Sequence, residues 1–314
     1  MSHLIEFDSV SKMYGKVVAL RKVNLRVEEG VSGLVGPNGA GKSTVIKAIL
    51  GLIRPDKGTV RAFGLDPWTH GEDVRRRIGV LHEKPEFPRW ATGYQLVRMV
   101  SEFRGIEDPE KESETKLRRF GLGDSMRRSV GTYSAGMVQR LGLAQALVGN
   151  PELVILDEPT GNLDPDGRRE VLELVGETHR DQGTSFLLSS HVLPELQRVS
   201  DHLIIMNLGS VLEEGQVEDL MSKHCLWTRR IRYEKEEKGE RIRSSFRGAS
   251  EITMDAGFVT IRSSSKKLLQ EGIDGLVSSG VIRPSDIEEE DNLMEELYMK
   301  VLRSGSAREN PGAK

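Results

Sequence analysis

The sequence predicts an α/β fold with a helical subdomain inserted into it and a small α+β domain after it. Short apolar stretches alternate with longer helical patterns from Leu4 to about Leu220, which is the arrangement of an α/β core. A charged, mostly helical stretch interrupts this alternation, and the composition changes again at Lys223. We therefore expect a main domain at 1–222 with a helical insertion at about 88–150, an accessory α+β domain at 223–303 and a disordered polar tail at 304–314.

The charge and composition of the chain exclude several functional classes. The formal net charge of −3 gives no general attraction to nucleic acid, so we expect no nucleic-acid partner. The single cysteine, Cys225, cannot form an internal disulfide and fits a reducing compartment. The first residues lack the basic start and apolar run of a signal peptide, and no stretch of about 18 residues is free of charge. We expect a cytoplasmic chain that does not itself span a membrane.

The first motif is a glycine-rich loop between a buried strand and a helix, in GLVGPNGAGKSTVIKAILGL. Glycines let the backbone N–H groups point inward, and a helix N-terminus adds partial positive charge, so the loop suits a polyphosphate. Lys42 is placed to reach the β- and γ-phosphates, and Ser43 to offer its hydroxyl to Mg²⁺. The alternative is a glycine-rich turn with an exposed lysine. The predicted nucleotide-binding residues of this loop are Gly36, Pro37, Asn38, Gly39, Ala40, Gly41, Lys42, Ser43 and Thr44.

The second motif opens a helix in the stretch TYSAGMVQRLGLAQALVGNPE. Ser134 is placed to cap this helix, whose apolar face runs from Val138 to Leu147. Gly136 keeps the helix entry bare of side chains. A capped, glycine-containing helix start is a potential anion site. A plain capped helix is the alternative.

The third motif is LVILDEPTGNLDP, in which four apolar residues predict a buried strand. Asp157 and Glu158 follow at the carboxyl end of that strand, where ligands bind in open α/β sheets. One carboxylate there suits Mg²⁺, usually through water, and the other is placed to orient or deprotonate an attacking water. The alternative is a strand that ends in a polar turn.

The region after Lys223 predicts a charged hairpin, a strand and two helices. WTRRIRYEKEEKGERIRSSF predicts the hairpin, and the glutamates that follow its arginines favour a solvated surface over a nucleic-acid patch. GFVTIRS predicts the strand. The first helix carries the apolar residues Leu268, Leu269, Ile273, Leu276 and Val277, and the second carries Leu293, Leu297 and Val301.

Together these motifs resemble a known family. GPNGAGKST, YSAGM, LVILDEP, NLD and SSH occur in the order and at the spacing of the ATP-binding cassette proteins, over Leu4 to about Leu220. The resemblance implies a P-loop NTPase cassette that binds ATP and Mg²⁺ and hydrolyses ATP. It implies that Tyr14 stacks on adenine, Asp157 holds Mg²⁺ through water, and Glu158 activates the hydrolytic water. His191 would contact the γ-phosphate. The catalytic residues would then be Glu158, His191 and Lys42.

The resemblance also implies that two cassettes act together in a two-fold dimer, either a homodimer or a pair of paralogues. In that family the signature segment caps the ATP held by the other subunit; here this segment is Ser134, Ala135, Gly136 and Met137. Asp164 would lie at the contact between the cassettes. Taken singly, Tyr14 also fits an ordinary loop aromatic and His191 a hydrogen-bonded core histidine; the order of the motifs favours the functional interpretation.

Two positions depart from the family pattern. The signature reads YSAGM where LSGGQ is the common form, so the serine and the second glycine are retained. Glu83 stands where the family usually has a glutamine that contacts Mg²⁺ and couples the site to the membrane partner, which leaves its role as a metal ligand open.

A single cassette followed by a short α+β extension is similar to the ATPase subunit of transporters of the ABC-2 exporter type. The resemblance implies an integral-membrane permease as a separate chain, export as the direction of transport, and a location on the inner face of the membrane. A non-transport ATPase of translation would normally have two cassettes, and one of DNA repair would have a long coiled coil. A P-loop GTPase or kinase would not account for YSAGM or SSH.

Overall fold

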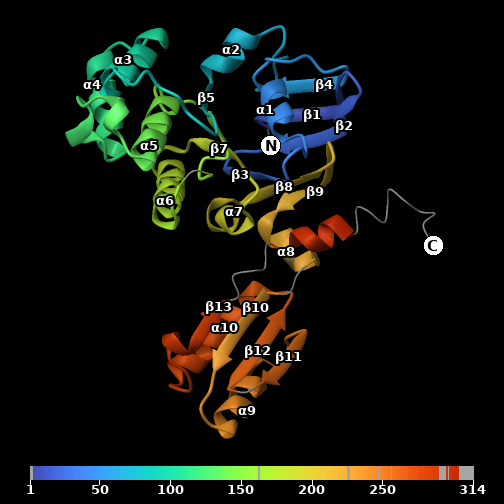
Figure 1. Cartoon of the computed structure of the whole chain (residues 1–314). Helices are drawn as coiled ribbons and strands as arrows, with labels where there is room; N and C mark the ends of the chain where they lie inside the picture. The colour runs from blue at the N-terminus through green and yellow to red at the C-terminus, as the bar shows by residue number, and fades with distance from the viewer. Residues whose placement is uncertain are drawn as a thin grey trace. The chain divides into compact units, whose positions relative to one another are not determined.

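The computed structural model describes residues 3–161, 163–224, 227–246, 248–255, 257–289, 295 and 297–303. The chain forms two compact units, Met1–Glu214 and Gly215–Lys314 (Figure 1). The expected end of the main domain, at residue 222, lies inside helix α8 (Val217–His224), which belongs to the second unit. The expected disordered tail at 304–314 lies outside the described residues.

The first unit is built on a six-stranded sheet with the order β5-β6-β7-β3-β8-β9. Strands β5, β6, β7, β3 and β8 pair in parallel, and the residues of β6 before Asp157, together with all those of β3 and β7, are buried, as expected of apolar strands covered on both faces. The bounds of the strands are β3 Val31–Val35, β5 Ile78–Leu81, β6 Leu153–Asp157, β7 Ser185–Ser190, β8 His202–Asn207 and β9 Ser210–Gln216.

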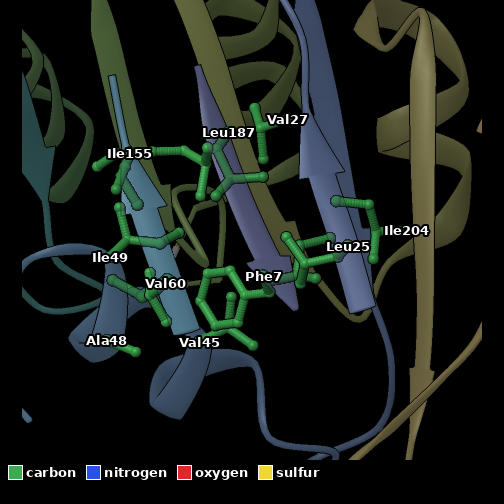
Figure 2. Close-up of a cluster of buried hydrophobic side chains, with 14 of the residues drawn as sticks. Phe7, Leu25, Val27, Val45, Ala48, Ile49, Val60, Ile155, Leu187 and Ile204 are labelled. Atoms are coloured by element: carbon green, nitrogen blue, oxygen red, sulfur yellow. The ribbon is translucent and has the colours of Figure 1, made fainter. Parts of the chain in front are cut away.

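A second, antiparallel sheet in the same unit has the order β2-β1-β4. Its strands are β1 Ile5–Tyr14, β2 Val17–Val27 and β4 Lys57–Ala62. Helix α1 (Lys42–Ile49) packs with both sheets in one apolar core, to which Phe7, Val45 and Ile155 all belong (Figure 2). This core fixes the start of α1, and with it the glycine-rich loop that precedes the helix.

The predicted helical insertion contains α3, α4 and α5, which contact one another and gather at one side of the first unit (Figure 1). Each of these helices begins at a side-chain cap, namely Thr92, Asp108 and Ser134. The helices of the unit after α1 are α2 Gly71–Arg76, α3 Gly93–Phe103, α4 Pro109–Arg119, α5 Ala135–Ala146, α6 Pro165–Gln182 and α7 Leu193–Val199. Among the described residues, no helix is long and apolar enough to cross a membrane.

The second unit contains α8 and a β-α-β-β-α-β arrangement in which both helices contact a four-stranded sheet of order β11-β12-β10-β13. All three strand pairs are antiparallel. The bounds are β10 Trp227–Arg232, α9 Glu236–Ser245, β11 Glu251–Asp255, β12 Phe258–Ser263, α10 Lys266–Ser278 and β13 Ile287–Glu289.

The predicted charged hairpin is wrong, because β10 is followed by helix α9 and not by a second strand. The glutamates, lysine and arginines of this stretch are good helix formers, and helical spacing lets Ile242 and Phe246 be buried together while the charges face solvent. The strand at β12 and the helix at α10 are confirmed. In the last predicted helix Leu297 and Val301 are helical and buried, whereas Leu293 lies outside the described residues.

Candidate active site

The three neighbouring strands β6, β7 and β3 bring the main motifs to one edge of the large sheet. Ser189 in β7 pairs in register with Asp157 on one side and Leu34 on the other. The glycine-rich loop follows β3, Glu158 follows β6 and His191 follows β7. Because the carboxyl ends of parallel strands meet at the same edge, three segments far apart in the sequence converge there.

The glycine-rich loop has a backbone that requires glycine. Gly39 and Gly41 have φ angles of 83° and 106°, and a Cβ on Gly41 would lie 2.7 Å from the carbonyl oxygen of Ala19. Gly41 is the N-cap of α1 and provides no side-chain hydrogen bond to the first turn. The first N–H groups of α1 are therefore not satisfied by a cap, which leaves them suited to an anion.

Lys42 lies inside this loop and is only 6% exposed. Its Nζ donates to the carbonyl oxygen of Gly36 at 2.6 Å and lies 3.1 Å from Oε1 of Glu158. That carboxylate oxygen is buried, and among the described residues its contact is the ion pair with Lys42. Lys42 is thus a buried cation whose charge partner is the carboxylate of Glu158. A phosphate oxygen could replace this carboxylate as the partner of Lys42 when a nucleotide binds.

Glu158 adopts a left-handed backbone conformation, with φ of 48°. This region is unfavourable for a residue with a side chain, and such strain is found at functional sites that the surrounding structure holds in place. The backbone N–H of Glu158 donates to the carbonyl oxygen of Ser189 at 3.1 Å. Its Oε2 lies 2.6 Å from Nδ1 of His191, whose side chain is about half exposed. The acid thus lies between Lys42 and His191.

Asp157 is held by a neighbour that the sequence analysis did not assign a role. The hydroxyl of Ser189 donates to Oδ1 of Asp157 at 2.6 Å. Ser189 is the first residue of the SSH motif, so the signal was present in the sequence, but only His191 was selected from it. The hydrogen bond fixes one oxygen of Asp157 and leaves the other available.

The residues at this edge fit Mg²⁺ bound together with phosphates. Among the described residues, no group of three or more His, Cys, Asp or Glu side chains is placed to hold a metal ion by itself. Mg²⁺ usually takes one or two protein oxygens and completes its shell with waters and substrate phosphates. The hydroxyl oxygen of the exposed Ser43 and the carboxylate oxygens of Asp157 are metal ligands of that type.

Tyr14 and Glu83 lie at the ends of two other strands, β1 and β5. Tyr14 ends β1 and is 45% exposed, with Nζ of Lys12 5.8 Å from the centre of its ring. Glu83 follows β5, and its exposed carboxylate lies 3.7 Å from Nζ of Lys84. Both residues remain candidates whose roles rest on the family resemblance.

The signature segment lies at the start of α5, and the predicted cap is confirmed. The hydroxyl of Ser134 accepts from the backbone N–H of Met137 at 3.2 Å, and a Cβ on Gly136 would meet open space. Ser134 and Ala135 are exposed. Asp164 is likewise an N-cap, at the start of α6, where its Oδ1 accepts from Gly167.

Comparison with known proteins gives a consistent result. A family model described as ABC transporter matches residues 20–161. The bacitracin transport ATP-binding protein of Enterococcus faecalis is 36% identical over 229 residues, which are 73% of this chain and 74% of that protein. The daunorubicin/doxorubicin resistance ATP-binding protein of Streptomyces peucetius is 37% identical, over 69% of this chain and 67% of that protein. The lantibiotic transport ATP-binding protein of Streptococcus pyogenes is 33% identical, over 74% of this chain and 99% of that protein.

Solved structures agree with this result. An ATP-binding subunit of an ABC transporter matches with a TM-score of 0.63 and 30% identity, over 70% of this chain and 92% of that chain. A bacterial ABC transporter cassette solved as a dimer has the same fold, with a TM-score of 0.61 and 24% identity, over 68% of this chain and 98% of that chain. The sequence identity and the shared fold lead to one conclusion: this chain belongs to the ABC transporter family, as an ATP-hydrolysing, ATP-binding subunit similar to the ATP-binding proteins of bacitracin and lantibiotic transport.

Proposed function

We propose that the chain hydrolyses ATP at a composite site between two cassettes and thereby powers export through a separately encoded membrane permease. The observation that carries this proposal is the cluster of Lys42, Glu158 and His191 at the ends of β3, β6 and β7. An acid that contacts a buried cation on one side and an imidazole on the other is an arrangement that phosphoryl transfer to water can use.

Each residue of the cluster has a distinct role in this proposal. The loop from Gly36 to Thr44 binds the phosphates through its N–H groups, and Lys42 exchanges its contact with Glu158 for the β- and γ-phosphates. Glu158, freed from Lys42, accepts a proton from the attacking water. His191 donates a hydrogen bond to the γ-phosphate and orients Glu158 through the contact between Nδ1 and Oε2. Mg²⁺ would be held by Ser43 and, through water, by Asp157, and when bound it stabilises negative charge on the phosphates.

The position of the signature segment supports a composite site. Among the described residues, no hydrogen bond or ion pair joins Ser134–Met137 to the loop Gly36–Thr44. Yet this capped helix start is exposed and bare at Gly136, as a surface that receives an anion from outside would be. A second copy, or a paralogue, brings its own signature segment to the phosphates by two-fold symmetry, so that two ATP molecules lie between two cassettes.

The relatives support the direction of transport and the kind of cargo. Their names refer to transport of bacitracin or a lantibiotic, or to resistance to daunorubicin and doxorubicin. We therefore infer that the cargo of this transporter is an antimicrobial compound that is moved outward. In this proposal the chain attaches to the inner face of the membrane through its permease, as the family resemblance implies.

The composite site is tested with Glu158→Gln, because an amide cannot accept the proton but preserves the shape of the side chain. We expect hydrolysis to fall by at least about 100-fold, the usual contribution of a general base, while Mg-ATP binding persists. Size-exclusion chromatography with Mg-ATP should then show a dimer. Glu112→Gln, which changes a carboxylate that accepts from the backbone N–H of Gly149 away from the cluster, serves as the control. Hydrolysis at the wild-type rate, or a monomer with Mg-ATP even in the presence of a competent partner cassette, would contradict the proposal.

A further inference from the structure

We propose that Glu195 in α7 is a positioning residue that holds Glu158 and His191 in the geometry required for hydrolysis. The proposal rests on the proposed function, because it assumes the roles given above to these two residues. It assigns a role to a side chain that no motif of the sequence singled out and that lies in the helix after the His191 segment.

Glu195 is a buried carboxylate with three partners from three different segments. It is 8% exposed. Its Oε2 accepts a short hydrogen bond from the hydroxyl of Thr160 and lies 3.4 Å from the hydroxyl of Ser190. Its Oε1 accepts from Nη1 of Arg168 at 3.5 Å. Thr160 and Ser190 are themselves buried, so the contact between these groups is shielded from water.

Each partner lies next to a residue of the site. Thr160 is in the turn that follows Glu158, and that turn is closed by a hydrogen bond from the N–H of Gly161 to the carbonyl oxygen of Glu158. Ser190 directly precedes His191. Arg168 also donates, through Nε, to the carbonyl oxygen of Leu163, the residue before Asp164. One carboxylate therefore connects the three segments that carry Glu158, His191 and Asp164.

The strained backbone of Glu158 explains why the contacts of Glu195 are needed. A left-handed glutamate relaxes to a more favourable backbone conformation unless its surroundings prevent it. The hydrogen bond from Thr160 to Glu195 anchors the turn on one side, and the hydrogen bond from Glu158 to Ser189 anchors it on the other. When the first anchor is lost, the Glu158 carboxylate moves relative to His191. Small displacements of catalytic groups lower the rate of the chemical step strongly while leaving the phosphate contacts of the loop in place.

The pair Thr160→Val and Thr160→Ser separates positioning from packing. Valine preserves the shape of threonine but removes the hydroxyl that Glu195 accepts from, whereas serine retains the hydroxyl and loses a methyl group. If Thr160 only fills space, serine is the more damaging change, because it leaves a small cavity. If the hydrogen bond to Glu195 positions Glu158, valine is the more damaging change, and serine preserves the activity.

We expect Thr160→Val to lower kcat for Mg-ATP hydrolysis by about 10- to 100-fold in the full-length chain, with KM and the Kd for Mg-ATP within about twofold of wild type. Thr160→Ser should retain kcat within about threefold. Glu195→Gln retains one acceptor oxygen and loses the other, so its kcat should also fall while Mg-ATP binding persists. The control Glu112→Gln should leave kcat unchanged.

The proposal is overturned if Thr160→Val has wild-type kcat, if serine is more damaging than valine, or if KM rises in parallel with the loss of kcat. A failure of Glu195→Gln to fold would leave the threonine pair to decide the question. The proposed function is tested separately, since it predicts slow hydrolysis by Glu158→Gln. If Glu158→Gln is inactive and Thr160→Val is fully active, only the role of Glu195 is wrong.

Discussion

Glu158 adopts a backbone conformation that a glutamate does not prefer, and it does so between a lysine and a histidine. The two contacts of the Glu158 carboxylate have different fates, because Lys42 exchanges its contact for phosphate whereas the contact with His191 is kept. A buried lysine without any anion would be costly, so Glu158 also stabilises the loop before nucleotide binds. This explains why one acid has both a structural and a chemical role.

Glu83 provides a test of the metal environment. Its carboxylate is exposed and lies near Lys84, but its place after β5 corresponds to the glutamine that contacts Mg²⁺ in the family. A carboxylate near both Mg²⁺ and a triphosphate is attracted by the metal and repelled by the phosphates, and the two energies are similar in size. If Glu83 is a metal neighbour, Glu83→Gln should change the Mg²⁺ concentration that gives half-maximal ATPase activity by about threefold or more while leaving metal-free ATP binding nearly unchanged. An identical Mg²⁺ titration would assign Glu83 to the surface.

The buried His202 in β8 should make the free energy of unfolding depend on pH. Burial lowers the pKa of this histidine below its ordinary value, and the charge of Glu28 opposes this shift only in part. The native state therefore binds fewer protons than the unfolded state, so the free energy of unfolding falls as pH drops below about 6.5. His202→Gln should reduce this loss in urea unfolding between about pH 7.5 and about pH 5.5.

Glu214 provides the counterpart to this measurement. Its Oε1 lies 3.9 Å from Nε2 of His202, and burial raises the pKa of this carboxyl. The native state then binds more protons than the unfolded state, which gives a slope of the opposite sign above about pH 4.5. Glu214→Gln should therefore steepen the loss of stability in acid. Equal pH slopes for the wild type and His202→Gln would exclude the histidine as the cause.

At the scale of the elements, the parts with a strong local pattern could be predicted from the sequence. The strand–loop–helix unit around Lys42, the strand β6 and the capped helix α5 each combine apolar periodicity with a special residue at the boundary. The charged stretch that forms α9 has one buried apolar side chain, Ile242, and a second, Phe246, at its C-cap, so its periodicity was too weak to distinguish a helix from a hairpin. Glu195 could not be assigned, because its role depends on a contact with Thr160, 35 positions away. Ser189 lies in the SSH motif, but its contact with Asp157, 32 positions away, is visible only in the fold.

Two helix caps in the helical insertion allow the effect of a cap on folding stability to be separated from its effect on dimer formation. Ser134 caps α5 and Asp108 caps α4 in the same way, through a side-chain oxygen that accepts from the third following N–H. Ser134→Ala and Asp108→Ala should each lower the free energy of unfolding by about 1 kcal/mol. Only Ser134→Ala should also weaken the Mg-ATP-dependent dimer of the Glu158→Gln chain, because only this cap belongs to the signature segment. Equal effects of both variants on dimerisation would mean that the serine is merely a cap.

At the scale of the whole molecule, the nucleotide chemistry and the C-terminal sheet belong to different units. All the residues proposed to bind ATP lie between Tyr14 and His191, within the unit Met1–Glu214. The lantibiotic relative is matched over 99% of its own length by 74% of this chain, so an entire ATP-binding subunit corresponds to less than the full chain. We therefore expect the β-α-β-β-α-β unit to be an addition to the cassette.

Truncation after Gln216 tests this division, because it keeps β9 and with it the complete large sheet. We expect the Kd for Mg-ATP to stay within about threefold of the full chain, since the phosphate loop and its supporting core are retained. We expect the truncated chain to lose either coupling to the permease or stability of the dimer. Coupling is measured as permease-stimulated ATPase activity, and dimer stability as the amount of ATP-dependent dimer on size-exclusion chromatography. Cooperative thermal unfolding of the truncated chain verifies that it is folded. A loss of Mg-ATP affinity on the order of 100-fold, about 2.7 kcal/mol, would mean that the second unit contributes to the nucleotide site and that the site is not confined to the cassette.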